Sequence, residues 1–202
     1  RTSFTQEDLQ RLLQQQIEGL QAELQQPNVI ASNVWQQLLF GKGHGFATSM
    51  SGSMSALQGI TLDDIINFSA QSLTSSNLKI IMVGDVSEQE IAGKLAFLQN
   101  LPASGLTIRE QPATPQLAGG TLYLVDKPGA AQSEIRVGYL TQLSYSPVGD
   151  FFERSLMNYV LGGAFNSRIN INLREEKGYT YGARSGFSGN RLPGPFSASA
   201  SV

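Results

Sequence analysis

The sequence lacks cysteine altogether and has a single histidine, His44, among its 202 residues. Without cysteine the chain can form no disulfide, no thiolate zinc site and no cysteine nucleophile. A zinc site needs several protein ligands, most often His or Cys, so we interpret His44 as a loop or packing residue. A Ser-His-Asp triad would also have to use His44, and no G-x-S-x-G motif accompanies it.

Charged residues are also scarce, at 15% of the chain, and the formal net charge is −2. A nucleic-acid-binding domain would show a basic face, so the composition argues against a nucleic-acid partner. No apolar run approaches the roughly 18 residues of a transmembrane helix. Hydrophobic residues still make up 41% of the chain, which is enough for a core. The first residue is Arg1 rather than Met, which indicates a piece of a longer protein.

In the first half, apolar spacing and helix-start residues predict a mostly helical segment. Leucines and Ile17 recur at helical spacing from Thr5 to about Gln25, and Pro27 can open a second helix. Two further helices are predicted to begin after Thr61 and Ser87, each with an acidic residue at the third position of a capping box. A short apolar run, "LKIIMVGDV" (78–86), predicts a buried strand.

Proline and glycine then break the pattern, and we place a linker at 106–115. Beyond it, alternating residues predict strands at 121–125 and 133–140. A helix is predicted from Asp150 and ends at Gly162-Gly163; a shorter one begins near Ser167 and stops at Gly178. "YTYGARSGF" and "PFSASASV" predict two more strands. The pattern predicts an α+β fold in which an antiparallel sheet packs on helices.

The stretch "LGGAFNSRININLREEKGYTYG" (161–182) contains the most suggestive polar cluster. Arg174 near the end of a short helix and Tyr181 at the start of a strand could meet across the turn at Gly178. Both side chains donate hydrogen bonds, so together they could bind a peptide carbonyl or stabilise an oxyanion. The alternative is that Arg174 pairs with a neighbouring glutamate and Tyr181 is a half-buried strand residue.

The same stretch resembles the C-terminal region of the pitrilysin/insulinase family of zinc metallopeptidases, which includes the mitochondrial processing peptidase. Other segments resemble successive landmarks of that family in the same order: "FTQEDLQRLLQQQIEGLQ", "LLFGKGHGF", "GITLDDIINFSA", "IIMVGDVSEQEI" and "LVDKPGAAQSEIRVGY". The family's zinc-binding motif, His-x-x-Glu-His, does not occur here. The resemblance therefore implies a segment with no catalytic residue and no bound metal, from a parent whose zinc lies in another, active domain.

The resemblance also implies the architecture and the site. Residues 1–105 would be the end of one family domain and 116–202 the beginning of the next, in the two-layer arrangement of the processing-peptidase or LuxS type. Arg174 and Tyr181 match the family's substrate-binding Arg and Tyr, which hold the peptide backbone opposite the zinc. Tyr179 ranks second, because we expect it to point to the other face of the strand.

The function that the resemblance implies is substrate binding within a zinc-dependent endopeptidase, inactive by itself and partnered by a zinc-bearing half or subunit. The strand near Tyr181 would pair with an extended peptide by strand addition. The alternatives are a catalytically silent scaffold homologue and an unrelated α+β domain. The inactive half of a bacterial enzyme of the periplasm or cell envelope is favoured. The two halves of the segment could also form one composite domain, within a chain or between two chains in a homodimer.

Overall fold

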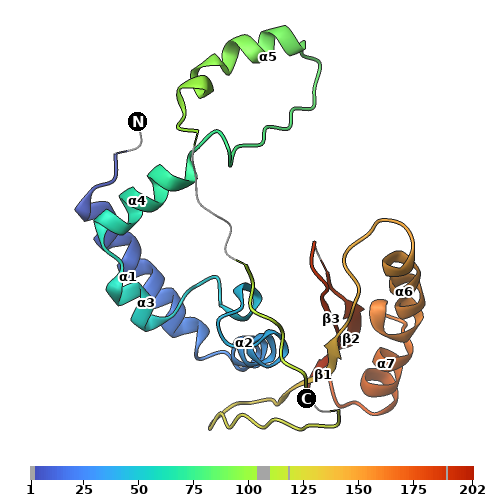
Figure 1. The fold of residues 1–202 in the computed structure, drawn as a ribbon. Helices are drawn as coiled ribbons and strands as arrows, with labels where there is room; N and C mark the ends of the chain where they lie inside the picture. Colours follow the sequence, from blue (N-terminus) through green and yellow to red (C-terminus); the bar gives the residue numbers. More distant parts are fainter. Residues whose placement is uncertain (1–2, 104–109, 118, 190) are drawn as a thin grey trace. The chain divides into compact units, whose positions relative to one another are not determined.

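A computed structural model of the chain describes residues 3–103, 110–117, 119–189 and 191–202 (Figure 1). Contacts divide the chain into two compact units, and we describe each by itself. The first unit comprises Arg1–Glu18 and Gly52–Glu110, and the second comprises Gly19–Ser51 and Gln111–Val202. The predicted linker at 106–115 lies partly outside the described residues, and the domain bounds at 105 and 116 stay predictions.

The first unit is built from helices whose starts are set by local side-chain caps. Thr61 accepts from the backbone N–H of Asp64, and the Asp64 carboxylate accepts from Thr61 in return, so this capping box lowers the pKa of Asp64. Ser87 and Glu90 repeat the arrangement. The helices are α1 (Gln6–Glu23), which continues into the second unit, α3 (Met54–Gly59), α4 (Leu62–Ser72), α5 (Glu88–Lys94) and the 3-10 turn η2 (Ala96–Asn100).

Two segments predicted to be strands, 78–86 and 121–125, form no strand in the structure. Their apolar side chains are largely exposed: Ile81 is 89% and Val83 94% accessible. An alternating apolar pattern gives a segment the tendency to form a strand, but a strand forms only when a partner edge is available. Within the described part of the chain neither segment has such a partner. The composite domain, which requires 78–86 to join the second half's sheet, therefore stays a prediction.

The second unit contains a three-stranded antiparallel sheet in the order β1-β3-β2. Its strands are β1 (Glu134–Leu140), β2 (Ala183–Phe187) and β3 (Pro195–Ser201). Two further hydrogen bonds between Ser133 and Val202 extend the β1–β3 ladder by one residue pair. Because β1 and β2 both run antiparallel to β3, they begin at the same end of the sheet.

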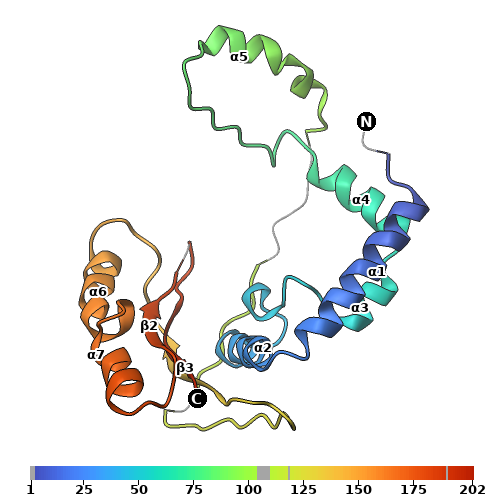
Figure 2. The ribbon, with the colours of Figure 1, turned by 180° about the vertical axis from the view of Figure 1, so that it is seen from behind.

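A layer of short helices covers β2 (Figures 1 and 2). It consists of α6 (Asp150–Asn158), the π-helical turn η3 (Tyr159–Gly163), α7 (Arg168–Asn170) and the π-helical turn η4 (Ile171–Glu176). Asn158 joins this layer to the sheet: its Nδ2 donates to Ser185 O at 2.7 Å, and Ser185 Oγ donates to its Oδ1 at 2.6 Å. Both residues are buried, so each polar group needs the other as its hydrogen-bond partner in place of water.

The helix α2 (Pro27–Phe40) packs on β1 instead. Arg136 Nη2 donates to Asn28 O and Ser32 Oγ, and Leu140, on the same strand face, packs against the small core of Leu39, Phe40 and Ala47. His44 belongs to this region. It is buried, stacks on the Phe40 ring at 5.1 Å, and its Nδ1 accepts from the N–H of Phe46 in the 3-10 turn η1 (Gly45–Ala47). The interpretation of His44 as a packing residue is consistent with these contacts.

The architecture confirms the predicted α+β class, with an antiparallel sheet packed on helices. Among the described residues, no helix combines the length and the apolar character needed to cross a membrane.

Gly162 provides a test of how closely η3 approaches β2. A Cβ atom at Gly162 would lie 2.8 Å from Ser185 Cβ, which is closer than real side chains approach. We expect Gly162→Ala to destabilise the chain by about 1–3 kcal/mol, the usual cost of overpacking. Urea unfolding measures this change. Gly186→Ala is the matched control, because an added Cβ there meets no atom within 4 Å; equal effects of the two substitutions would contradict the packing.

Candidate functional site

The residues leading into β1 and β2 meet at the end of the sheet where both strands begin. Gln132 directly precedes the Ser133–Val202 pair, and Tyr181 lies two residues before β2. Between them is a cavity of about 420 Å³, to which η4 and the following turn also contribute. The cavity is lined by Gln132, Arg174, Glu175, Gly178, Tyr179, Thr180 and Tyr181.

Gly178 turns the chain from η4 towards β2. Its φ of +67° lies in the left-handed region that glycine adopts without a Cβ clash. The turn is closed by two hydrogen bonds, from the Gly178 N–H to Arg174 O at 3.2 Å and from the Tyr179 N–H to Leu173 O at 2.9 Å. Arg174 and Tyr181 both line the cavity next to this turn.

Arg174 is held by two neighbours. Its Nε lies 3.2 Å from Glu175 Oε1, and its Cζ lies 4.5 Å from the centre of the Phe165 ring. The Arg174–Glu175 pair is the one that the alternative interpretation predicted. The side chain nevertheless remains 36% accessible, and among the described residues no other group engages its Nη atoms. The stacked guanidinium therefore keeps two donor groups available to a ligand.

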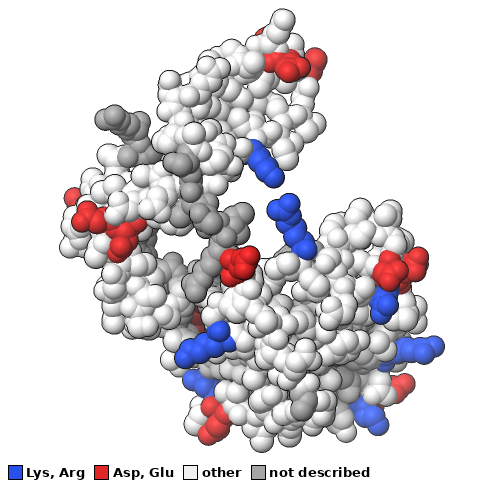
Figure 3. Space-filling view, in the orientation of Figure 1, with Lys and Arg blue, Asp and Glu red and all other residues white. Residues whose placement is uncertain are grey.

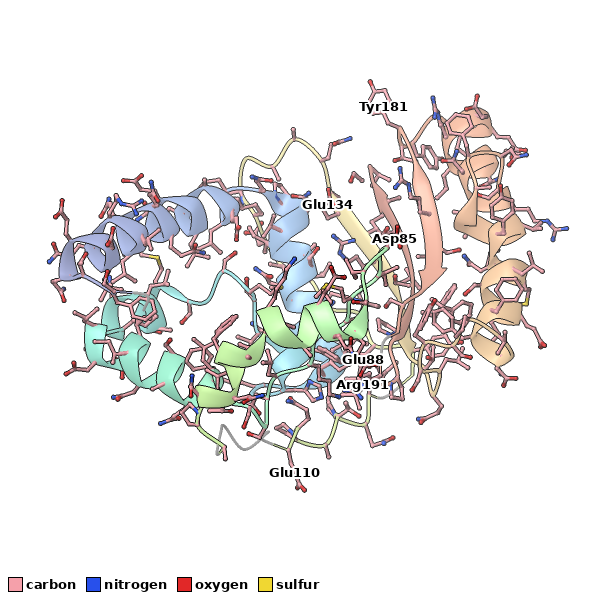
Figure 4. The ribbon with its side chains drawn as sticks, turned by 90° about the horizontal axis from the view of Figure 1, so that it is seen from above. Asp85, Glu88, Glu110, Glu134, Tyr181 and Arg191 are labelled. Atoms are coloured by element: carbon pink, nitrogen blue, oxygen red, sulfur yellow. The ribbon has the colours of Figure 1, made fainter. Side chains whose placement is uncertain are left out.

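Tyr181 is 89% accessible and projects from the chain just before β2 (Figure 4). This exposure differs from the half-buried strand position of the alternative interpretation. The loop itself is anchored by buried Thr180, whose Oγ1 donates to Gly182 O and accepts from the Gly182 N–H. Tyr179 is 62% accessible and lines the same cavity. The expectation that it faces away from Tyr181 is therefore wrong, since residues two apart share a face even in an extended strand.

Buried Asn170 fixes the spacing between the two sides of the site. Its Nδ2 donates to Phe165 O at 2.6 Å, and its Oδ1 accepts from the Ala183 N–H at 2.9 Å. The Asn170 amide thus links Phe165, on whose ring the Arg174 guanidinium stacks, to β2, which begins two residues after Tyr181.

Asn170 and Asn158 also occupy the outer edge of β2, because they bind Ala183 N–H and Ser185 C=O. The Gly182 N–H is taken by Thr180. The Ala183 N–H and the Ser185 C=O are among the groups that a strand added at this edge would use. The addition of a peptide to the strand near Tyr181 stays a prediction.

A second cavity of about 480 Å³ adjoins the first, and Tyr179 lines both. Its walls are almost entirely apolar and come from β1, β3 and the α7–η4 segment, including Ile135, Val137, Ile169 and Leu173. Tyr179 thus stands at the boundary between a polar and an apolar cavity.

The site contains one carboxylate, Glu175, and no imidazole. In the part of the chain that the structure describes, no three His, Cys, Asp or Glu side chains come close enough together to hold a metal ion. On the face shown in Figure 3, positive and negative side chains are interspersed. Neutral donors with a single paired arginine suit a neutral polar ligand, such as a peptide backbone, better than a metal or a polyanion.

Comparison with known proteins identifies the family. A family model described as the peptidase M16 inactive domain matches residues 59–202. The chain belongs to the peptidase M16 inactive-domain family. The resemblance to the pitrilysin-type metallopeptidases is thereby confirmed, and the chain is a non-catalytic domain of a peptidase-like protein. Among curated protein sequences, none matches this chain.

Solved structures show the same fold. A peptidase M16 inactive domain from Pseudomonas fluorescens is 28% identical with a TM-score of 0.81, and the match covers 100% of this chain and 48% of that one. A protease from Helicobacter pylori is 18% identical, with a TM-score of 0.79 over 98% of this chain and 48% of that one. A chain of complex III2 from Candida albicans, solved with Inz-5 bound, is 16% identical, with a TM-score of 0.69 over 100% of this chain and 48% of that one. The M16 segment thus spans about half the length of the chains it matches.

Sequence reasoning missed Gln132 as a member of the site. Gln132 directly precedes the strand predicted at 133–140, lies far from Arg174 in the sequence, and carries no motif. Only the β1-β3-β2 register, which places the starts of β1 and β2 at one end, brings it to the cavity.

The Asn170 bridge makes a prediction about stability. Asn170→Ala leaves the Ala183 N–H and the Phe165 C=O without their partner, and we expect a loss of about 1–3 kcal/mol in the free energy of unfolding. Urea unfolding monitored by circular dichroism measures it. Asn172→Ala is the matched control on the same helical turn: the Asn172 amide bonds Glu176 at an exposed position, and we expect a change within about 0.5 kcal/mol. A control that costs as much as Asn170→Ala would contradict the role of the bridge.

Proposed function

We propose that the chain is a non-zinc, substrate-binding segment of a zinc-dependent endopeptidase. Arg174 and Tyr181 hold the backbone of the peptide substrate, opposite a zinc site in another domain or subunit. The observation that carries the proposal is the cavity at the sheet end, which brings both side chains and Tyr179 to one place.

The chemistry of the two side chains fits this role. The Nη groups of Arg174 remain available while Glu175 and Phe165 hold the rest of the guanidinium, so the donor is oriented before a ligand arrives. The exposed Tyr181 hydroxyl adds a second donor. A peptide carbonyl accepts hydrogen bonds from both, and it accepts them more strongly once attack at the carbonyl places negative charge on its oxygen.

The zinc belongs elsewhere in this proposal. The chain has one histidine, which is buried against Phe40, and among the described residues no three His, Cys, Asp or Glu side chains cluster together. A catalytic zinc needs several ligands and an open position for water. We therefore assign the metal, and with it the reaction, to a zinc-bearing half or subunit of the same family. By itself the segment would cleave no peptide.

A catalytically silent scaffold is the second candidate. The observation in its favour is the likeness of fold to a chain of complex III2 from Candida albicans. The sequence of the complete parent distinguishes the two candidates. An endopeptidase carries His-x-x-Glu-His in its own active half or in a partner subunit, whereas a scaffold assembly carries it in neither.

Mutation of the two donors in the complete parent protein tests the proposal. Hydrolysis is followed with a library of internally quenched peptides, and the peptide cleaved best serves as substrate. We expect Arg174→Ala and Tyr181→Phe each to lower kcat by about 10²–10³-fold, the usual cost of losing one oxyanion donor.

Two controls accompany these variants. Arg168→Ala removes an exposed arginine of α7, and Tyr145→Phe removes a hydroxyl from a tyrosine whose ring packs on Phe151, away from the cavity. Both should keep the wild-type rate. Wild-type rates for Arg174→Ala and Tyr181→Phe as well would rule out the proposed role.

A further inference from the structure

A peptide backbone in the cavity presents both hydrogen-bond acceptors and hydrogen-bond donors. The proposed pair, Arg174 and Tyr181, mainly provides donors. Each residue of an extended peptide carries a carbonyl acceptor and an N–H donor. Arg174 has no acceptor atom, and the Tyr181 hydroxyl is assigned to the carbonyl. The N–H groups of the bound peptide therefore need an acceptor from another residue of the cavity.

Four other lining side chains carry an oxygen that can accept: Glu175, Tyr179, Thr180 and Gln132. The Tyr179 hydroxyl, like that of Tyr181, can also donate, so it can serve the carbonyl of the peptide. The Glu175 carboxylate is paired with Arg174 Nε at 3.2 Å. Thr180 Oγ1 is buried and engaged in both directions with Gly182. Within the described part of the chain, no hydrogen bond engages the Gln132 amide, and the residue is exposed. A ligand can therefore use the Gln132 amide oxygen as an acceptor without breaking an internal contact.

The backbone of Gln132 is well positioned for this role. Ser133, the next residue, exchanges two hydrogen bonds with Val202, of 2.7 and 3.0 Å, and so fixes the start of β1. The side chain extends from this fixed point on the β1 side of the cavity, whereas Tyr181 stands on the β2 side, with β3 between the two strands. A peptide that contacts both residues would cross the end of the sheet.

We propose that Gln132 is a third peptide-binding residue of this site. Its side-chain oxygen accepts a hydrogen bond from a backbone N–H of the peptide whose carbonyl is held by Arg174 and Tyr181. The inference rests on the proposed function and extends it, because it gives the site recognition of both polar groups of the backbone, independently of the peptide's side chains.

The test uses the complete parent and the quenched peptide that it cleaves best. Gln132→Ala is expected to lower kcat/KM by about 3–10-fold, the range for losing one neutral hydrogen bond. Gln132→Glu keeps an acceptor oxygen and should retain most of the activity. Gln142→Ala is the matched control, because Gln142 follows β1 at the opposite end of the strand; it should have no effect.

Backbone-modified peptides then identify the N–H. A series of analogues is made in which one amide at a time is replaced by an ester, which keeps the carbonyl and removes the N–H. For one analogue, Gln132→Ala should cost nothing further, while the other analogues show the full loss. A structural role for Gln132 would instead lower the rate for every analogue and would lower the melting temperature too.

The outcomes separate this inference from the proposed function. If Arg174→Ala slows hydrolysis and Gln132→Ala does not, the inference about Gln132 is wrong and the proposed function stands. If Gln132→Ala costs the same for every ester analogue, the inference is also wrong. If neither Arg174→Ala nor Gln132→Ala changes the rate, the proposed function fails and the role of Gln132 fails with it.

Discussion

The site depends on the two hydrogen bonds of the buried Asn170 amide. The amide donates to the C=O of Phe165, the residue on whose ring Arg174 stacks, and accepts from the N–H of Ala183, two residues after Tyr181. The bond to Ala183 is buried, so its N–H would have no water to replace the amide. These two hydrogen bonds link the Arg174 side of the cavity to the Tyr181 side, in addition to the turn at Gly178.

Side-chain amide hydrogen bonds also engage the outer edge of β2. Asn158 binds the Ser185 C=O and Asn170 binds the Ala183 N–H, two of the outward backbone groups of β2. Gln132, Arg174 and Tyr181 line one cavity at the end of the sheet.

The features that sequence alone predicted are those set by near neighbours along the chain. The capping boxes at Thr61 and Ser87 depend on residues three positions apart, and Gly178 ends a helix through its own backbone conformation. The Arg174–Tyr181 pair lies within one helix-to-strand turn, so a motif could mark it.

The features that sequence did not predict depend on distant partners. The apolar runs at 78–86 and 121–125 have strand character without a strand to pair with among the described residues. Gln132 joins the site only through the register of three strands, and two backbone groups of β2 are bound by asparagines from the helical layer. The hydrophobic pattern and the secondary-structure propensity of a segment do not show which distant segment it will contact, because both are properties of that segment alone.

The structure of the complete parent with a bound, uncleaved peptide tests the central claim most directly. The account predicts a peptide carbonyl oxygen within about 2.7–3.2 Å of an Arg174 Nη atom and of the Tyr181 hydroxyl, at the end of the sheet. A peptide bound with both side chains beyond hydrogen-bonding distance, and Arg174 still paired only with Glu175, would contradict it.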